Sequence, residues 1–148
     1  MLGPCPCILH RQVTKTPMAL PYNRPKYRPK HPRIKNEPHL NFIRSLPCLV
    51  TGTAGVDAAH IRYSDHRCAK RAVGIGEKPD DKFTIPLCRQ EHQKQHSMNE
   101  REYWTDLGID PVFVALALWS VSGDEESGER IVQEARLNMG NLTCKREG

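Results

Sequence analysis

The chain has 148 residues, which suits one domain with a tail, and 38% of them are hydrophobic. No apolar stretch reaches the roughly 18 residues that a membrane-spanning helix needs, and residues 1–9 are too short and too rich in proline for a signal peptide. We therefore expect a cytoplasmic protein without a membrane partner, whose six cysteines are free thiols.

The positive charge is concentrated at the N-terminal end. Residues 1–40 hold eight Lys or Arg against one Glu, a net +7, which leaves −2 for the rest of a chain whose net charge is +5. Residues 1–38 are also rich in proline, which disfavours helix and interior strand, so an extended, flexible arm is predicted. A basic arm favours contact with a polyanion such as a nucleic acid backbone, although a solvated linker fits the same composition.

A short helix and two strands are predicted after the arm. Residues 37–46 form the helix, which Pro47 ends, and its apolar residues share one face: Leu40, Ile43 and Leu46. The strands cover residues 56–62 and 83–87, where apolar residues alternate with others. The polar loop between them is long enough to reach a ligand.

Helices are predicted for the remainder. The first is expected to have Pro86 in its first turn and to carry Cys88, His92 and His96 on one face, because residues four apart are neighbours on a helix. Capping patterns predict three more, which start at Asn99, at Asp110 and at Ser122, the last ending at Gly140. Their apolar side chains are expected to face the core: Tyr103, Trp104, Leu107, Val114, Leu118 and Trp119.

Three histidines suggest chemistry on phosphate. A neutral imidazole at His60, with a pKa near 6.5, can take a proton from water, and Arg62 on the same strand face can hold a phosphate nearby. His92 and His96 can share one divalent cation, which would offset phosphate charge. The simpler alternatives are a structural histidine at position 60 and two surface histidines on a polar helix.

The motifs follow one order along the chain: residues 46–48, 57–62, 78–81 and 85–88, then His92, His96 and Glu100. This order resembles the HNH (His-Me finger) endonucleases, most of all small phage and prophage members akin to the recombination-enhancement nucleases. The resemblance implies an α+β fold with a ββα-metal core over residues 39–109. Residues 110–148 would then be a C-terminal helical extension that packs on the core.

The resemblance also implies the catalytic roles. His60 falls on the general base, and Asp81 or Asp80 is nearest to the loop residue that orients this base. The cofactor is one divalent ion, Mg²⁺, Mn²⁺ or Zn²⁺, with His92 and His96 as ligands.

The third metal ligand of many relatives directly precedes the base, where this chain has Ala59. Asp57 is the candidate to replace it. Because it lies roughly 6.5 Å further along the strand, it could do so only if the strand bends.

Relatives that hold a structural zinc use paired cysteines. In this chain the partners of Cys48 and Cys88 are replaced by Thr51 and Glu91, so half of each pair is missing. A structural zinc on Cys48 and Cys88 is one alternative, and two small buried apolar side chains are the other.

The predicted function is metal-dependent hydrolysis of phosphodiester bonds in DNA, by nicking or broad cleavage, with a recombination or phage protein as a further partner. Besides the arm, five basic residues are assigned to the nucleic acid backbone: Arg62, Arg67, Lys70, Arg71 and Lys78. Two other functions stay open. One is a non-catalytic nucleic-acid-binding module on a degenerate HNH fold, and the other is a zinc-stabilised protein-interaction domain. The oligomeric state is not predicted.

Overall fold

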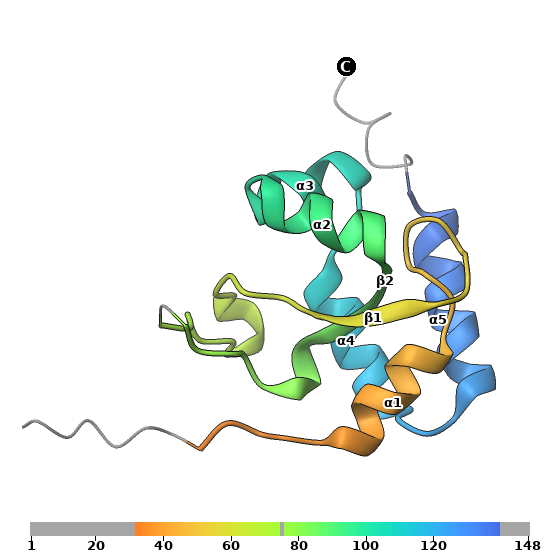
Figure 1. The fold of residues 1–148 in the computed structure, drawn as a ribbon, viewed down its shortest axis with the longest axis horizontal. Coiled ribbons are helices and arrows are strands. Elements are labelled where there is room, and N and C mark those ends of the chain that lie inside the picture. Colours follow the sequence, from red (N-terminus) through yellow and green to blue (C-terminus); the bar gives the residue numbers. More distant parts are fainter. Residues whose placement is uncertain (1–31, 75, 140–148) are drawn as a thin grey trace, which may run out of the picture. The chain divides into compact units, whose positions relative to one another are not determined.

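The structure is a computed structural model that describes residues 32–74 and 76–139. Within these residues, five α-helices surround one two-stranded antiparallel sheet, which confirms the predicted α+β class (Figure 1). The helices and strands in chain order are α1 (Glu37–Ser45), β1 (Val56–His60), β2 (Thr84–Cys88), α2 (Arg89–Ser97), α3 (Glu100–Leu107), α4 (Pro111–Ser120) and α5 (Glu125–Leu137). Two short 3-10 turns, η1 (His66–Cys68) and η2 (Asp81–Phe83), lie between the strands.

The pairing of the two strands brings the end of β1 next to the segment that leads into β2. The register pairs Val56 with Cys88 and His60 with Thr84, so η2 lies beside the end of β1. Pro86 pairs with Ala58 inside β2. A proline has no N–H to donate, but both strands of a two-stranded sheet are edges, where this loss is tolerated.

The predicted start of the histidine-bearing helix is therefore wrong. The helix α2 begins at Arg89, and Cys88 is the last residue of β2 and the N-cap of α2. His92 and His96 share the helix as predicted, whereas Cys88 lies on the strand.

The helix α1 forms where its sequence predicts. Its N-cap Asn36 accepts a hydrogen bond from the backbone N–H of His39, and the chain leaves the helix at Leu46, before Pro47. The predicted apolar face, which comprises Leu40, Ile43 and Leu46, is buried in the core. Other members of this core come from the turn before β1, the strands and the C-terminal helices: Leu49, Ala59, Ile85, Leu87, Trp104, Val112, Leu118 and Val132.

Two of the three predicted C-terminal caps are confirmed. Asn99 and Asp110 cap α3 and α4 through side-chain oxygens, but the cap of α5 is Asp124 and not Ser122. Ser122 lies in the preceding turn, where its hydroxyl pairs with His39. On α4, Leu118 is buried as predicted, whereas Val114 and Trp119 are only half-buried, because the helix turns Pro111, Val112 and Ala115 inward. The predicted stop at Gly140 lies outside the described residues.

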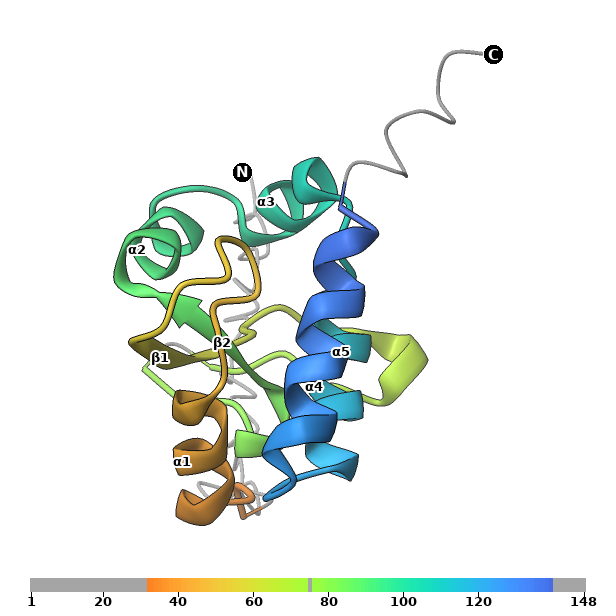
Figure 2. The same cartoon turned by 90° about the vertical axis from the view of Figure 1, so that its right-hand side faces the viewer.

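The helices cover the sheet unevenly. Figures 1 and 2 show α2 and α3 on one side of the strand pair and α1 on the opposite side, with α4 and α5 packed next to each other. Among the described residues, no helix has the length and apolar character needed to cross a bilayer.

Candidate active site

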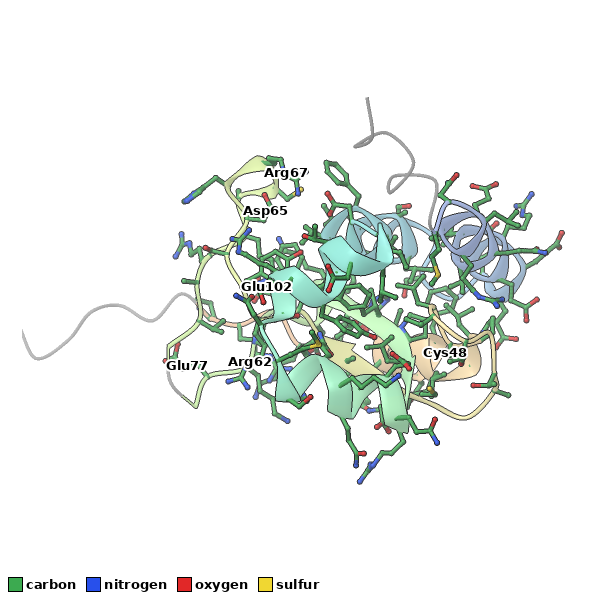
Figure 3. All side chains as sticks on the ribbon, turned by 90° about the horizontal axis from the view of Figure 1, so that it is seen from above. Cys48, Arg62, Asp65, Arg67, Glu77 and Glu102 are labelled. Atoms are coloured by element: carbon green, nitrogen blue, oxygen red, sulfur yellow. The ribbon has the colours of Figure 1, made fainter. Side chains whose placement is uncertain are left out.

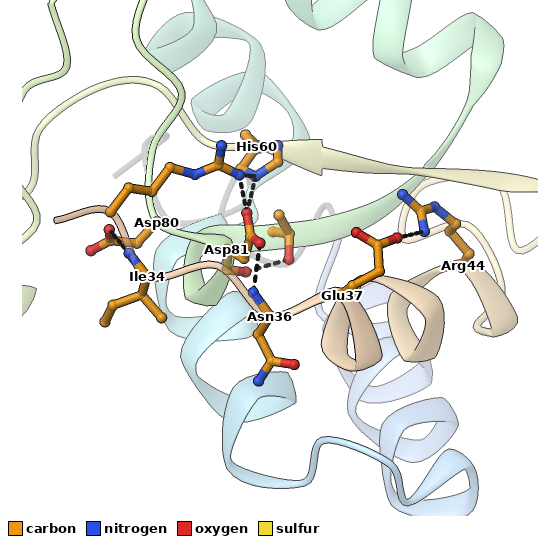
Figure 4. Close-up of polar contacts among 9 residues, drawn as sticks. Ile34, Asn36, Glu37, Arg44, His60, Asp80 and Asp81 are labelled. Atoms are coloured by element: carbon orange, nitrogen blue, oxygen red, sulfur yellow. Dashed lines mark hydrogen bonds and ion pairs between the residues drawn. The ribbon is translucent and has the colours of Figure 1, made fainter.

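A buried carboxylate lies against His60 at the end of β1. The His60 Nε2 atom is 2.9 Å from Asp81 Oδ1, and Asp81 is only 2% exposed (Figure 4). Of the two predicted orienting residues, Asp81 therefore contacts the imidazole. Asp80 instead accepts a hydrogen bond from the backbone N–H of Ile34.

The Asp81 carboxylate accepts hydrogen bonds from three groups. They are the ring of His60, the guanidinium of Arg33, and the backbone N–H of Asn36 at 2.9 Å. Burial opposes ionisation of Asp81, but these hydrogen bonds outweigh it and hold the carboxyl pKa below its ordinary value. Asp81 is therefore ionised at neutral pH.

The environment of His60 favours the neutral imidazole. Burial is the largest influence that lowers its pKa, and the positive charges of Arg33 and Lys78 act in the same direction, which outweighs the attraction of Asp81. If Nε2–H donates to Asp81, the lone pair lies on Nδ1. Among the described residues, no protein group hydrogen-bonds to that Nδ1 atom, which leaves it as a candidate base.

A second histidine cluster joins α2 to β1. Asp57 Oδ2 lies 3.1 Å from His92 Nδ1, and His92 Nε2 lies 3.1 Å from His96 Nε2. Through this contact the carboxylate favours the tautomer that carries N–H on Nδ1, which leaves the Nε2 lone pair of His92 directed at His96. Burial is the largest influence that lowers the pKa of His96, and the positive charges of His92 and Arg62 act in the same direction, which favours the neutral form of His96.

Asp57 thus lies behind the ring of His92 and orients it. It contacts Nδ1 of that ring and not Nε2, and the sequence prediction that Asp57 joins His92 and His96 as a metal ligand stays a prediction. Over residues 32–74 and 76–139, no set of three or more His, Cys, Asp and Glu side chains is arranged as metal ligands.

The two clusters belong to the same strand but are separate. Asp57 and His60 are three residues apart on β1, about 10 Å along a strand, and alternation directs them to opposite faces. Within the described part of the chain, no hydrogen bond links His60 to His92 or His96.

Polar side chains that sequence reasoning missed hold α2 in place. Glu91 and Gln95 are buried on the face of α2 that turns inward. Tyr103 Oη donates to Glu91 at 2.9 Å, and Gln95 donates to Glu100 at 2.7 Å. The spacing of Glu91 and Gln95, four apart like His92 and His96, is the one signal in the sequence that could have indicated this second polar face.

The predicted phosphate-binding residues divide into two groups. Arg62, Arg71 and Lys78 are exposed. Arg67 of η1 forms an ion pair with Asp65, the N-cap of that turn, which lies next to it in Figure 3, and another with Asp110. Lys70 is 2% exposed and donates to the backbone oxygen of Tyr63.

A buried ammonium cannot reach a phosphate, and Arg67 already has two carboxylate partners. Lys70 is therefore badly placed for phosphate contact, whereas the assignment of Arg62, Arg67, Arg71 and Lys78 to the phosphate backbone stays a prediction. The segment of the predicted arm over residues 1–31 lies outside the described residues.

Cys48 and Cys88 are neighbours and carry no disulfide. The buried sulfur of Cys48 accepts hydrogen bonds from the backbone N–H groups of Cys88, at 3.2 Å, and of Thr51. Burial opposes ionisation of the thiol, but the hydrogen bonds lower the pKa of Cys48 below its ordinary value. Figure 3 shows Cys48 at the opposite end of the strand pair from Arg62.

Comparison with known proteins places these residues in a family. The chain is 28% identical over 93 residues to the uncharacterized protein YdfU of Escherichia coli strain K12, an alignment that covers 61% of this chain. The chain spans about a quarter of the length of that curated relative, since the alignment covers 25% of it. No solved structure matches the chain. The family described as "Protein of unknown function (DUF968)" matches residues 14–120, which include both histidine clusters. The chain therefore belongs to the DUF968 family.

Proposed function

We propose that this protein is a metal-dependent endonuclease of the HNH type, with a ββα-metal core, that hydrolyses phosphodiester bonds in DNA. The observation that carries the proposal is the pairing of histidines with carboxylates on one β-β-α unit. On β1, His60 pairs with the buried Asp81, and Asp57 pairs with His92 of α2. A strand pair followed directly by a helix is the element order that the sequence resemblance implies.

In the proposed reaction, His60 is the general base. Its imidazole is neutral at neutral pH, so Nδ1 can take a proton from the attacking water. Asp81 holds the ring through Nε2 and stabilises the imidazolium that forms, because the carboxylate is ionised and buried.

The donor set of His92 and His96 fits a divalent metal ion. The Nε2 atoms of His92 and His96 face each other at 3.1 Å, and the lowered pKa of His96 favours its neutral form. Two such nitrogen atoms are suited to share one cation. Such an ion would offset phosphate charge and stabilise the leaving oxygen. Asp57 keeps the ring of His92 in this orientation, and Arg62 and Lys78 attract the phosphate backbone.

The test is nicking of supercoiled plasmid in Mg²⁺ or Mn²⁺. The wild-type protein should convert supercoiled to open-circular DNA, and His60→Ala should abolish the conversion while DNA binding in a gel-shift assay is kept. His66→Ala is the matched control, because His66 is an exposed histidine on η1 that contacts neither cluster. Equal nicking by wild type and His60→Ala would contradict the proposal.

A second function, a non-catalytic nucleic-acid-binding module, has one observation in its favour. Ala59 occupies the position at which many HNH nucleases carry a metal ligand, and here it is 0% exposed and part of the apolar core. If the wild-type protein shifts DNA in a gel but nicks no plasmid in Mg²⁺, Mn²⁺ or Zn²⁺, this second function replaces the first.

A further inference from the structure

The segment that leads into α1 is hydrogen-bonded to the loop that carries Asp81. The backbone N–H of Ile34 donates to the Asp80 side chain at 2.9 Å, and the backbone N–H of Asn36 donates to the Asp81 side chain at 2.9 Å. In return, the backbone N–H of Asp81 donates to the carbonyl oxygen of Ile34 at 3.0 Å. These three bonds hold Ile34 and Asn36 against Asp80 and Asp81 (Figure 4), and Arg33 directly precedes Ile34 in this segment.

The side chain of Arg33 contacts both members of the His60–Asp81 pair. Its Nη2 atom donates to Asp81 Oδ1, the same oxygen that contacts His60 Nε2, and lies 3.4 Å from that Nε2 atom. The side chain is only 26% exposed. Its Nε atom is buried without a hydrogen-bond partner in the described part of the chain, so the guanidinium is held mainly through Asp81.

We propose that Arg33 is a positioning residue for His60, whose guanidinium holds the Asp81 carboxylate against the imidazole and opposes a second positive charge on the ring. This inference rests on the proposed function, in which His60 must accept a proton. Arg33 falls within the basic segment that the sequence assigned to phosphate contact, so the inference gives one arginine of that segment a role inside the site.

The charges that face His60 support the direction of the effect. Burial lowers the pKa of His60 most, Asp81 raises it, and Arg33 and Lys78 lower it. Removal of the Arg33 charge takes away one of the lowering influences and leaves Asp81 without its compensating cation. Both changes raise the pKa of His60.

The experiment is an NMR titration of the His60 ring in the full chain. Arg33→Gln should move the His60 midpoint to higher pH, and Arg33→Lys, which keeps the charge, should return it toward the wild-type value. Arg44→Gln is the matched control, because Arg44 pairs with Glu37 on the exposed side of α1, and it should leave the midpoint unchanged. A His60 midpoint in Arg33→Gln equal to that of wild type would overturn the proposal.

A second measurement uses the wild-type protein, in case Arg33→Gln fails to fold. The Arg33 Nε–H resonance should shift with the same midpoint as the His60 ring, since the two side chains are in contact. Independent midpoints would overturn the proposal. Neither titration needs nuclease activity, so a protein that nicks no DNA but shows these shifts would remove the proposed function and keep the role of Arg33 toward His60.

Discussion

The buried carboxylate of Asp81 is the residue on which the geometry of His60 depends. It is 2% exposed and ionised, and it accepts hydrogen bonds from an imidazole, a guanidinium and a backbone N–H. Because three groups donate to it, the Asp81 carboxylate is held in one orientation. The hydrogen bond from the His60 ring to Asp81 then fixes the orientation of that ring.

We predict that Asp81→Asn slows plasmid nicking by roughly a hundredfold or more, the size of a general-base contribution, because a neutral amide neither fixes the tautomer of His60 nor stabilises the imidazolium. The measurement is the nicking rate in Mg²⁺ at pH 7.5, with DNA binding as the internal reference. Unchanged nicking by a folded Asp81→Asn protein would show that His60 does not work through this carboxylate.

The buried His39 leads us to predict that the stability of the fold depends on pH. Its Nδ1 lies 2.8 Å from the hydroxyl of Ser122, its Nε2 is buried without a hydrogen-bond partner among the described residues, and burial lowers its pKa. The unfolded chain therefore binds a proton at a higher pH than the folded chain does. The free energy of unfolding should fall as the pH drops below about 6.5.

Thermal melts between pH 7.5 and pH 5 check this prediction. His39→Gln should weaken the dependence of the melting temperature on pH, whereas His66→Gln, at an exposed position, should leave it as in wild type. His60, whose pKa is also lowered, contributes in the same direction, so part of the dependence should remain. Identical slopes for His39→Gln and wild type would contradict the assignment.

At this scale, sequence reasoning found the histidines and Asp81 because a resemblance places them in a known order. It missed the contact of Arg33 with the His60–Asp81 pair and the hydrogen bond of the Tyr103 hydroxyl to Glu91. Arg33 lies 27 residues before His60, and its contact exists only because the segment before α1 pairs with the loop before β2. No local pattern in the sequence encodes that pairing.

At the scale of elements, α2 depends on α3 for its position. The inward face of α2 is polar, and Tyr103 of α3 donates to the buried Glu91. We predict that Tyr103→Phe lowers the free energy of unfolding by about 1–3 kcal/mol, because it leaves a buried carboxylate oxygen without its donor.

Urea unfolding measures this loss. Tyr63→Phe is the control: the Tyr63 ring lies under Arg101 and Lys70, and the change keeps that ring, so a loss within about 0.5 kcal/mol is expected. Equal losses from the two variants would mean that the Tyr103 hydroxyl does not anchor α2.

The contact between α5 and α1 has no room for an added methyl group. A Cβ atom at Gly128 would lie 2.7 Å from Cζ of Phe42 and 2.9 Å from Cδ2 of Leu46. Gly128→Ala should therefore lower the free energy of unfolding, because overpacking costs about 1–3 kcal/mol and exceeds the gain of about 1 kcal/mol in helix propensity.

The control is Glu129→Ala, at the exposed neighbouring position of α5. In the same unfolding experiment this substitution should leave the free energy of unfolding unchanged or raise it slightly. A Gly128→Ala protein more stable than wild type would show that the two helices separate at little cost.

The sequence predicted which helices and strands exist better than it predicted the residues at which α2 and α5 begin. Apolar spacing predicts α1 correctly, and caps predict α3 and α4. Pro86 misled the prediction because proline suits both the first turn of a helix and an edge strand, and only the pairing with Ala58 decides between them. Ser122 resembles a cap, but Asp124 is closer to the first turn of α5 and its side chain reaches the N–H of Ser127.

At the scale of the whole molecule, the order of elements puts two histidine clusters on one strand pair and its following helix. The DUF968 match over residues 14–120 spans α1 to α4, whereas α5 lies beyond it. The resemblance implied the α+β class, and apolar periodicity and capping patterns predicted strands and helices that agree with it. None of these signals could predict that Asp57 would orient His92, since this contact depends on the angle at which α2 crosses β1.

The proposed activity depends most directly on a divalent ion at His92 and His96, which a titration of the wild-type protein with Mn²⁺, followed by NMR, can locate. We predict that substoichiometric Mn²⁺ broadens the ring resonances of His92 and His96 first, leaves the exposed His66 sharp, and loses its effect in His92→Ala. Uniform broadening, or selective broadening at any other group of residues, would contradict the account.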